Sequence, residues 1–277
     1  MQPSTTTQIA KWLTGGFFFL LLAFPFWLHD LVSAQQQDSK LLPFFDNEDN
    51  PVPVGFPAGQ KLDITPPPPK LNSFDKAVLK VCGPIATRVN ATQFKNLLSY
   101  YPDVIEKLQK ITEGELQLGR KEKADFLLDL TDVWFKYQAF EHIFCGQIYN
   151  IHKIGGLHFY GRYLELQNKG IGGLLANNNE HQEVLPGVIY TMGIMIKQGE
   201  RIVSDRIKGY SYLTNAEDIL LDATKIFKLQ GEHEGDCIYN VRDWKTGKTF
   251  PSVFVRKEKA IVTFYPDATP HGQQCRS

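Results

Sequence analysis

The sequence predicts an α+β fold, in which a helical N-terminal part is followed by antiparallel sheets. Apolar residues recur at helical spacing in residues 87–110 and 121–140, and Pro102 should divide the first of these helices in two. Later segments alternate or are continuously apolar, as strands are, at residues 237–241, 250–256 and 260–265. Helices that precede the strands, rather than alternating with them, favour α+β over a parallel sheet.

The middle of the chain is expected to be mixed. Residues 143–150 are short and apolar, as a strand would be, and residues 159–167 have the spacing of a helix that ends near a glycine. The segments 188–196 and 201–204 are expected to pair as a hairpin, because a glycine lies in the short connection between them. A further helix is predicted at residues 216–229.

The N-terminus is expected to be a targeting segment. Lys11 precedes an uncharged apolar run over residues 12–28, and Val32-Ser33-Ala34 has the small residues of a cleavage site. Residues 1–34 are therefore predicted to be a signal peptide. The alternative is an uncleaved anchor, since about 17 apolar residues are the lower limit for a membrane span. The protein would be secreted or periplasmic, with no stable membrane association after cleavage, or membrane-anchored if the segment is kept.

Composition divides the rest of the chain. Residues 35–70 are predicted to be a linker, because they begin with a glutamine run and end in consecutive prolines. The globular domain is then expected at residues 71–270, with residues 271–277 as a C-terminal tail. Roughly 200 residues are enough for one domain, or two small lobes, with a sizeable core.

Charge and motifs exclude several functional classes. The net charge is zero, with 30 basic and 30 acidic residues, which argues against a large basic face that grips nucleic acid. An enzyme that engages a few phosphates locally remains compatible with this balance. The sequence has no phosphate-binding glycine loop, no GxSxG elbow, no HExxH pattern and no closely spaced cysteine pairs.

The four cysteines can form up to two disulfides in an exported protein, by three possible pairings. We favour a bond between Cys237 and Cys275. Cys145 is interpreted as a possible buried free thiol, because it lies inside the stretch that carries the candidate catalytic residues.

Candidate catalytic residues are concentrated in residues 140–170. This stretch carries His142, His152 and His158, and the pair Gly155-Gly156 before the last histidine indicates a tight turn. Histidine exchanges protons near neutral pH because its ordinary pKa is about 6.5. Two histidines brought together by a glycine turn would form the pair that general acid–base catalysis needs. A metal site built from the three histidines is the alternative.

Cleavage of RNA without a metal has a simple chemical requirement. One group accepts the proton of the ribose 2′-hydroxyl, and a second gives a proton to the departing 5′-oxygen. A cation balances the charge that builds on the phosphorane. Two histidines and one lysine would supply this set, although composition alone cannot choose the lysine.

FEHIF and GLH, the segments around His142 and His158, resemble the two histidine elements of the EndoU family, the uridylate-preferring endoribonucleases of animals, bacteria and the coronavirus replicase. The first is FEHIF at residues 140–144, followed by Gly146. The second is Gly156-Leu157-His158 with its aromatic pair at residues 159–160. Many family members have glutamate where this sequence has Gln147. The sequence therefore lacks the second carboxylate that those members have beside the first histidine element.

Two later elements continue the resemblance in the same order. The segment IKGYSYLT at residues 207–214, which leads into a predicted helix, resembles the family's lysine element, although its tyrosines and leucine replace smaller or different residues. TFYP at residues 263–266 resembles the terminal element. The resemblance covers about residues 140–267, and it implies a two-lobed EndoU-like catalytic domain at residues 71–270.

The resemblance implies that the protein cleaves single-stranded RNA at uridines and leaves a 2′,3′-cyclic phosphate. His158 would be the general base and His142 the general acid, although the two could be exchanged. Lys208 would stabilise the charged intermediate. Thr263 would hydrogen-bond the uracil edge and Tyr265 would stack on or orient the sugar and base.

Supporting roles are implied for Gly156 and Gly209, and for Glu141, which would either orient His142 or cap a helix end. His152 is left out of the set. No cofactor or metal is required in this interpretation, although Mn²⁺ could stimulate activity through substrate binding or folding. The alternatives are a catalytically silent RNA- or glycan-binding module on the same fold, and a histidine-based metal hydrolase. The oligomeric state stays open.

Overall fold

The computed structural model describes residues 41–276. The predicted signal peptide or anchor, residues 1–34, lies outside the described residues, as do residues 35–40 of the predicted linker. Within residues 41–276, no helix is both long enough and apolar enough to cross a lipid bilayer.

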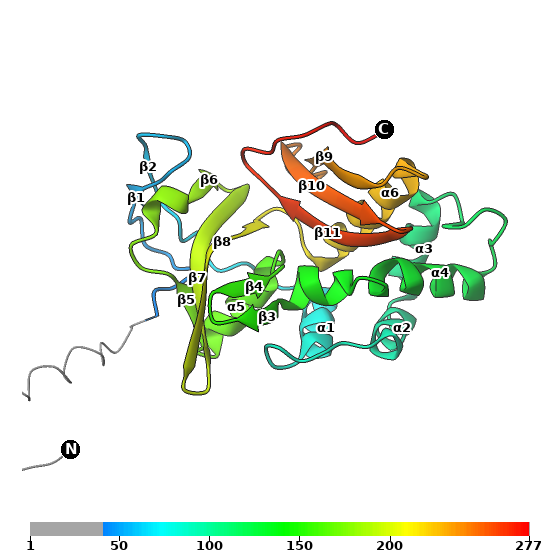
Figure 1. The fold of residues 1–277 in the computed structure, drawn as a ribbon, viewed down its shortest axis with the longest axis horizontal. Coiled ribbons are helices and arrows are strands. Elements are labelled where there is room, and N and C mark those ends of the chain that lie inside the picture. Colours follow the sequence, from blue (N-terminus) through cyan, green and yellow to red (C-terminus); the bar gives the residue numbers. More distant parts are fainter. Residues whose placement is uncertain (1–40, 277) are drawn as a thin grey trace, which may run out of the picture. The chain divides into compact units, whose positions relative to one another are not determined.

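Most α-helices of residues 41–276 precede the longer strands (Figure 1). The α-helices are α1 (Ser73–Cys82), α2 (Ala91–Ser99), α3 (Pro102–Ile111), α4 (Lys123–Phe135), α5 (Tyr160–Asn168) and α6 (Ala216–Gln230). Pro102 begins α3 and so separates it from α2 at the predicted point, because proline fits a first helical turn but not a helix interior. Asn72, Asn90 and Asn215 form reciprocal capping boxes at the starts of α1, α2 and α6.

The strands pair in antiparallel sheets, which confirms the predicted α+β class. One sheet has the order β5-β7-β6, with β8 also paired to β7, and another has the order β11-β10-β9; β1 pairs with β2, and β3 with β4. The strands are β1 (Val52–Pro53), β2 (Lys61–Leu62), β3 (Gln147–Asn150), β4 (Lys153–Gly155), β5 (Gly172–Leu174), β6 (Glu183–Leu185), β7 (Ile189–Gln198), β8 (Arg201–Ser211), β9 (Gly235–Arg242), β10 (Thr249–Lys257) and β11 (Ala260–Pro266).

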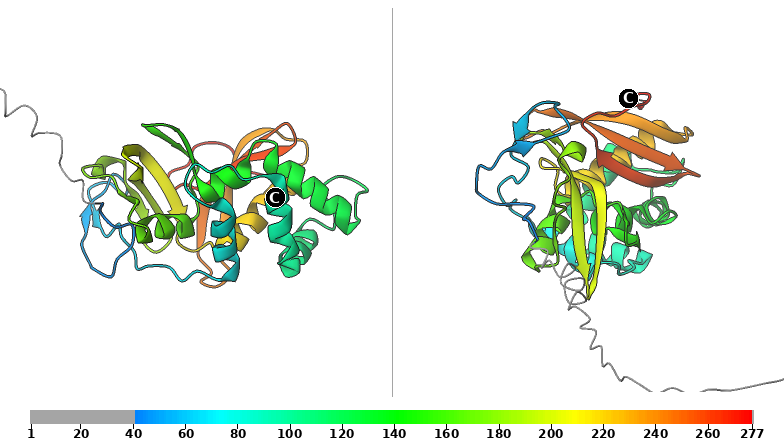
Figure 2. Two further views of the ribbon diagram at one scale, coloured as in Figure 1. Left: turned by 90° about the horizontal axis from the view of Figure 1, so that it is seen from below. Right: turned by 60° about the vertical axis from the view of Figure 1, so that its left-hand side comes forward.

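The two larger sheets meet where β8 contacts β11. Helix α5 packs against β5, whereas α4 and α6 pack against β11. Figure 2 shows the β7–β8 hairpin on one side and the β9–β11 sheet, together with α2, α3 and α4, on the other. The contact of β8 with β11 thus lies between two groups of helices and strands. These two groups correspond to the predicted two lobes.

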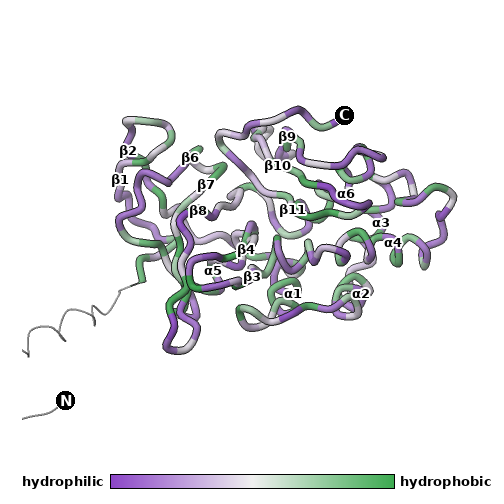
Figure 3. The backbone as a smooth tube through the Cα atoms, in the orientation of Figure 1, coloured by the Kyte–Doolittle hydropathy of each residue, from purple (hydrophilic) through white to green (hydrophobic). Residues whose placement is uncertain are grey.

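The core runs through both groups of elements. Hydrophobic residues concentrate along α1, α2 and the strands β10 and β11, whereas the tip of the β7–β8 hairpin is hydrophilic (Figure 3). Trp134 is fully buried between α4 and α6, and its indole N–H donates to the hydroxyl of Thr224 at 3.0 Å. The bond satisfies the one polar group of this large side chain, so the indole is buried without leaving its N–H unpaired.

Residues 41–70 are part of the folded unit, which corrects the predicted linker. Phe44 and Phe45 are buried, and their amides donate to the side-chain oxygen of Gln167 at 2.6 and 2.9 Å. A backbone bridge also joins Leu42 to the edge of β5. Composition predicted a linker because the segment is polar and proline-rich on average. Burial of two adjacent aromatic rings nevertheless attaches it to the fold, because their apolar surface outweighs that average.

All four cysteines are paired in disulfides. The favoured bond between Cys237 and Cys275 is confirmed, and it holds the predicted C-terminal tail against β9, where the amide of Cys275 donates to the carbonyl of Ile238 at 2.8 Å. The interpretation of Cys145 as a free thiol is wrong, because it bonds Cys82.

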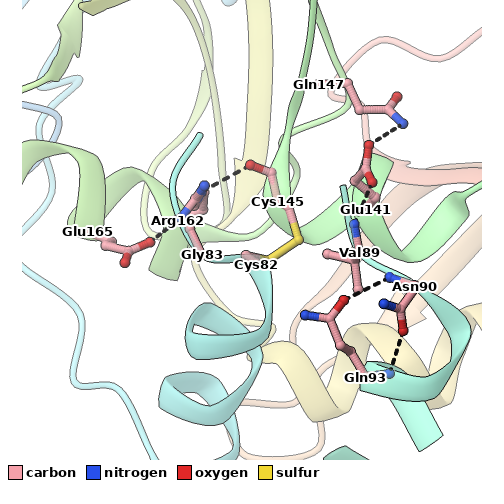
Figure 4. The surroundings of a disulfide bond; sticks show 10 residues. All are labelled: Cys82, Gly83, Val89, Asn90, Gln93, Glu141, Cys145, Gln147, Arg162 and Glu165. Carbon is pink, nitrogen blue, oxygen red and sulfur yellow. Dashed lines mark hydrogen bonds and ion pairs between the residues drawn. A yellow bond between two sulfur atoms is a disulfide. The ribbon is translucent and has the colours of Figure 1, made fainter. Parts of the chain in front are cut away.

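The disulfide between Cys82 and Cys145 joins the end of α1 to the turn that carries the first candidate histidine (Figure 4). Arg162 reinforces this junction, since Nε donates to the carbonyl of Cys145 at 3.0 Å and Nη1 to that of Gly83 at 2.9 Å. Glu165 pairs with the same guanidinium and compensates its buried charge. Crosslinking residues 63 positions apart stabilises the fold by roughly 4 kcal/mol in the chain-entropy model.

Substitution of Phe44 by alanine is expected to lower the free energy of unfolding by about 3–5 kcal/mol. The change removes a fully buried ring that packs edge-on against Tyr163, with 5.1 Å between ring centroids. Leu118→Ala is the matched control, because Leu118 is 94% exposed and should shift stability by no more than about 0.5 kcal/mol. Urea unfolding measures both, and an unchanged midpoint for Phe44→Ala would argue that residues 41–70 are a linker after all.

Candidate active site

His142 lies in a single turn of π-helix, η1 (Glu141–Cys145), that follows α4. The amide of Gly146 closes the turn by donating to the carbonyl of Glu141, five residues earlier, at 3.0 Å. Gly146 has a φ of +78°, which suits glycine and ends the turn abruptly. The predicted strand over residues 143–150 is therefore wrong in its first half, and only β3 is extended. Turns of this kind are frequent at functional sites.

Gly156 brings His158 against this turn. The amide of Leu157 donates to the carbonyl of His142 at 2.8 Å, and the amide of His158 donates to that of Ile143 at 2.7 Å. A Cβ atom on Gly156 would lie 1.7 Å from the carbonyl oxygen of His142, and its φ is +62°. The close approach is therefore open only to glycine, and it sets the two imidazole centroids 5.9 Å apart.

Lys208 reaches the same place from β8. Its ammonium pairs with the Asp205 carboxylate at 3.1 Å and also donates to the carbonyl of Ile207 at 2.9 Å. The same carboxylate oxygen of Asp205 accepts the amide of Ile154 in β4 at 3.0 Å. Asp205 thus ties the lysine to the hairpin between the two histidines. Sequence reasoning missed Asp205, because only the fold brings it next to β4.

Gly209 follows the lysine and completes the attachment of His158. Its carbonyl accepts the Nδ1–H of His158 at 3.1 Å, so the neutral ring has Nε2 as its free acceptor. A Cβ atom on Gly209 would lie 2.7 Å from the hydroxyl oxygen of Thr191, across the β7–β8 pair. The glycine lets the two strands approach closely at this point.

Thr263 and Tyr265 approach from β11, on the other sheet. The Tyr265 ring stacks on His158, with 5.1 Å between centroids and 25° between ring planes. The hydroxyl oxygen of Thr263 is buried and makes no hydrogen bond within residues 41–276. A buried hydroxyl without a partner is costly, so the hydrogen-bonding capacity of this atom is left unused by the protein.

One cavity of about 690 Å³ collects these residues. His142, His158, Lys208, Thr263 and Tyr265 all line it, so the structure brings together the predicted catalytic and base-binding residues. His152 is exposed and does not line it. The cavity has further polar lining residues that sequence reasoning did not single out, among them Tyr149, Lys153, Glu183, Thr191, Asp267, Thr269 and His271.

Glu141 acts on His142 through a third residue. Gln147 accepts the Nδ1–H of His142 at 3.1 Å, and its own amide donates to Glu141 at 3.1 Å. The other carboxylate oxygen of Glu141 accepts the amide of Val89 at 2.9 Å (Figure 4). Because a carboxylate only accepts, the Gln147 amide must turn its oxygen to His142, which fixes the proton on Nδ1 and leaves Nε2 free. Because residue 147 is glutamine rather than glutamate, His142 has a neutral hydrogen-bond partner instead of a charged one.

Burial makes both histidines weak bases. It lowers the pKa of His142 below its usual 6.5, although the hydrogen bond to Gln147 opposes the shift. It also lowers the pKa of His158 to about 3, with a further contribution from the charge of His142. Both groups are therefore mainly neutral at pH 7 in the free protein, as a general base must be.

No group of three or more histidine, cysteine, aspartate or glutamate side chains in residues 41–276 lies close enough to hold a metal ion. The cavity instead brings together two imidazoles and one ammonium, from His142, His158 and Lys208.

A comparison with known proteins finds a family match for the region that supplies most residues of the cavity lining. Residues 136–268, a little under half of the chain, match the model of the bacterial EndoU nuclease family. This region is similar to the EndoU family. The first histidine element, the second, the lysine element and the TFYP strand all fall inside it. This match supports an EndoU-like endoribonuclease in this part of the chain.

Two solved endoribonucleases of the same kind are similar to the chain. XendoU, a splicing-independent snoRNA-processing endoribonuclease, shares 16% identity at a TM-score of 0.48, over 73% of this chain and 76% of its own. Endoribonuclease Nsp15 of Middle East Respiratory Syndrome Coronavirus shares 16% identity at a TM-score of 0.35, over 57% of this chain and 40% of its own. No curated protein matches the sequence.

Substitution of Gly156 by alanine is expected to lower the free energy of unfolding by about 2–4 kcal/mol, because the new methyl group displaces the His142 carbonyl. Gly170→Ala is the matched control. Gly170 has a similar φ of +67° but nothing within 4 Å of its added Cβ, so only the backbone cost of about 1 kcal/mol applies. Thermal unfolding compares the two, and equal losses would show that the close approach is unimportant.

Proposed function

We propose that this EndoU-family protein cleaves single-stranded RNA after uridines by attack of the ribose 2′-hydroxyl on the adjacent phosphate. One observation carries the proposal. Both Nδ1 atoms are hydrogen-bonded to the protein, so the two Nε2 atoms remain for proton transfer in one cavity with the Lys208 ammonium. This is the acid, base and cation set that metal-independent cleavage of RNA needs.

The reaction moves two protons and exchanges one bond at phosphorus. Nε2 of His158 takes the proton of the 2′-hydroxyl while the 2′-oxygen bonds to phosphorus. Nε2 of His142, protonated, gives its proton to the 5′-oxygen as the bond between that oxygen and phosphorus breaks. The products are a 2′,3′-cyclic phosphate and a free 5′-hydroxyl. Lys208 balances the charge of the phosphorane.

The uracil would be bound on the side of His158. The unpaired hydroxyl of Thr263 both donates and accepts, as the edge of uracil requires. Tyr265 is held by its stack on His158, so it would order the ribose or base next to the general base. These contacts support a preference for uridine over larger bases.

We also propose that the protein acts outside the cytosol. Two disulfides persist in an oxidising compartment, which suits the predicted signal peptide. The protein would therefore be secreted or periplasmic, or membrane-anchored if residues 1–34 are kept. Catalysis would need no metal, and stimulation by Mn²⁺ would act on RNA binding or folding.

The purified protein is expected to cleave a uridine-containing oligonucleotide and to leave a cyclic phosphate, detected by mass spectrometry. His158→Ala and His142→Ala should each lower kcat by about 10²–10⁴-fold, and Lys208→Ala by about 10²–10³-fold. His152→Ala is the matched control and should retain full activity, because His152 is exposed outside the cavity. Binding without turnover would instead indicate a silent RNA-binding module.

The activity should also show a bell-shaped pH profile with its maximum below pH 6.5. His158 is in its neutral form above about pH 3, whereas protonated His142 is lost as the pH rises through its lowered pKa. Gln147→Glu should move the alkaline limb upward by roughly one unit, because a carboxylate beside Nδ1 favours the imidazolium. The exposed Gln198→Glu adds the same charge elsewhere and should leave the limb in place. A rate that climbs steadily to alkaline pH would contradict two titrating histidines.

A further inference from the structure

Tyr149 lines the active-site cavity but has no part in the acid–base set. It lies in β3, at the edge of the hairpin between the two histidines, and 57% of its surface is exposed. Its ring packs over Gly155, since a Cβ atom there would lie 2.5 Å from Cε2 of the tyrosine. A large aromatic side chain is therefore held against the backbone while much of its surface faces solvent.

The hydroxyl of Tyr149 places this ring on the His142 side of the cavity. It donates to Oε1 of Gln147 at 2.6 Å, the same oxygen that accepts the Nδ1–H of His142. Tyr265, in contrast, stacks on His158. Each of the two tyrosines is thus associated with a different histidine, and both line the same cavity.

A cation and an apolar side chain accompany Tyr149. The Lys153 ammonium lies 5.8 Å from the ring centre. Ile207, which is 56% exposed, also lines the cavity. Exposed aromatic rings next to basic side chains recognise single-stranded nucleic acid, because the rings stack on bases and the cations meet phosphates.

We propose that Tyr149 is a stacking subsite for the base of the leaving nucleotide, the one on the 3′ side of the scissile phosphate, with Lys153 placed to meet the following phosphate. The inference rests on the proposed function, because the assignment of sides follows from His142 as the acid that protonates the leaving 5′-oxygen. The uridine lies beside Tyr265, so the chain of the RNA continues toward Tyr149.

The test compares two oligonucleotides that differ only at the leaving nucleotide, which carries either adenine or no base. The parent protein is expected to cleave the first with a kcat/KM about tenfold higher, which corresponds to the loss of one base–aromatic stack. Tyr149→Ala should bring this ratio close to one. Tyr149→Phe keeps the ring and should keep the ratio, while any loss common to both substrates reports the hydrogen bond to Gln147.

Tyr100→Ala is the matched control, because Tyr100 is 82% exposed and does not line the cavity. A second measurement avoids chemistry: with 2′-deoxyuridine at the cleavage position, Tyr149→Ala should raise the Kd for the adenine oligonucleotide about tenfold and leave that for the abasic one unchanged. The subsite alone would be overturned if the kcat/KM ratio of the two oligonucleotides is unchanged in Tyr149→Ala, or if it is already close to one in the parent. A parent that cleaves neither RNA would overturn the proposed function, and the subsite with it.

Discussion

The site depends on two backbone hydrogen bonds between the segment after Gly156 and the turn that carries His142. Both imidazoles are fixed by main chain that is itself paired, so their separation does not depend on flexible side chains. The contact tolerates no side chain at Gly156, because its Cα faces the His142 carbonyl. A disulfide at Cys145 holds the other end of the same turn. The two histidines are thus held in position before any ligand arrives.

Two further hydrogen bonds determine which ring nitrogen of each histidine carries the proton. Gln147 fixes the tautomer of His142, and the carbonyl of Gly209 fixes that of His158. Each contact occupies Nδ1 and leaves Nε2 for the reaction. An amide rather than a carboxylate beside His142 leaves burial as the dominant effect, so the pKa of this histidine stays low. Under the proposed mechanism, this low pKa would place the maximum of activity at acid pH.

Many elements could be predicted from local patterns. The break at Pro102, the β7–β8 hairpin and the later strands follow from proline, glycine and apolar spacing, which act over a few residues. The anchoring of Phe44 could not be predicted, because its partners lie in α5, more than a hundred residues away. The π-turn at residues 141–145 was hidden for a similar reason, since its apolar residues suit a buried strand equally well.

For the site, the sequence by itself determined the chemistry available: two histidines, a lysine, a threonine and a tyrosine in the order of the EndoU elements. The tertiary structure decided how they work together. Asp205 meets Lys208 and β4, Gln147 joins Glu141 to His142, and Tyr149 lines the cavity only because the hairpin after η1 folds back. The residue types can be read from the sequence alone. Tautomers, neighbouring residues and subsites depend on distances between segments, and only the packed chain defines those distances.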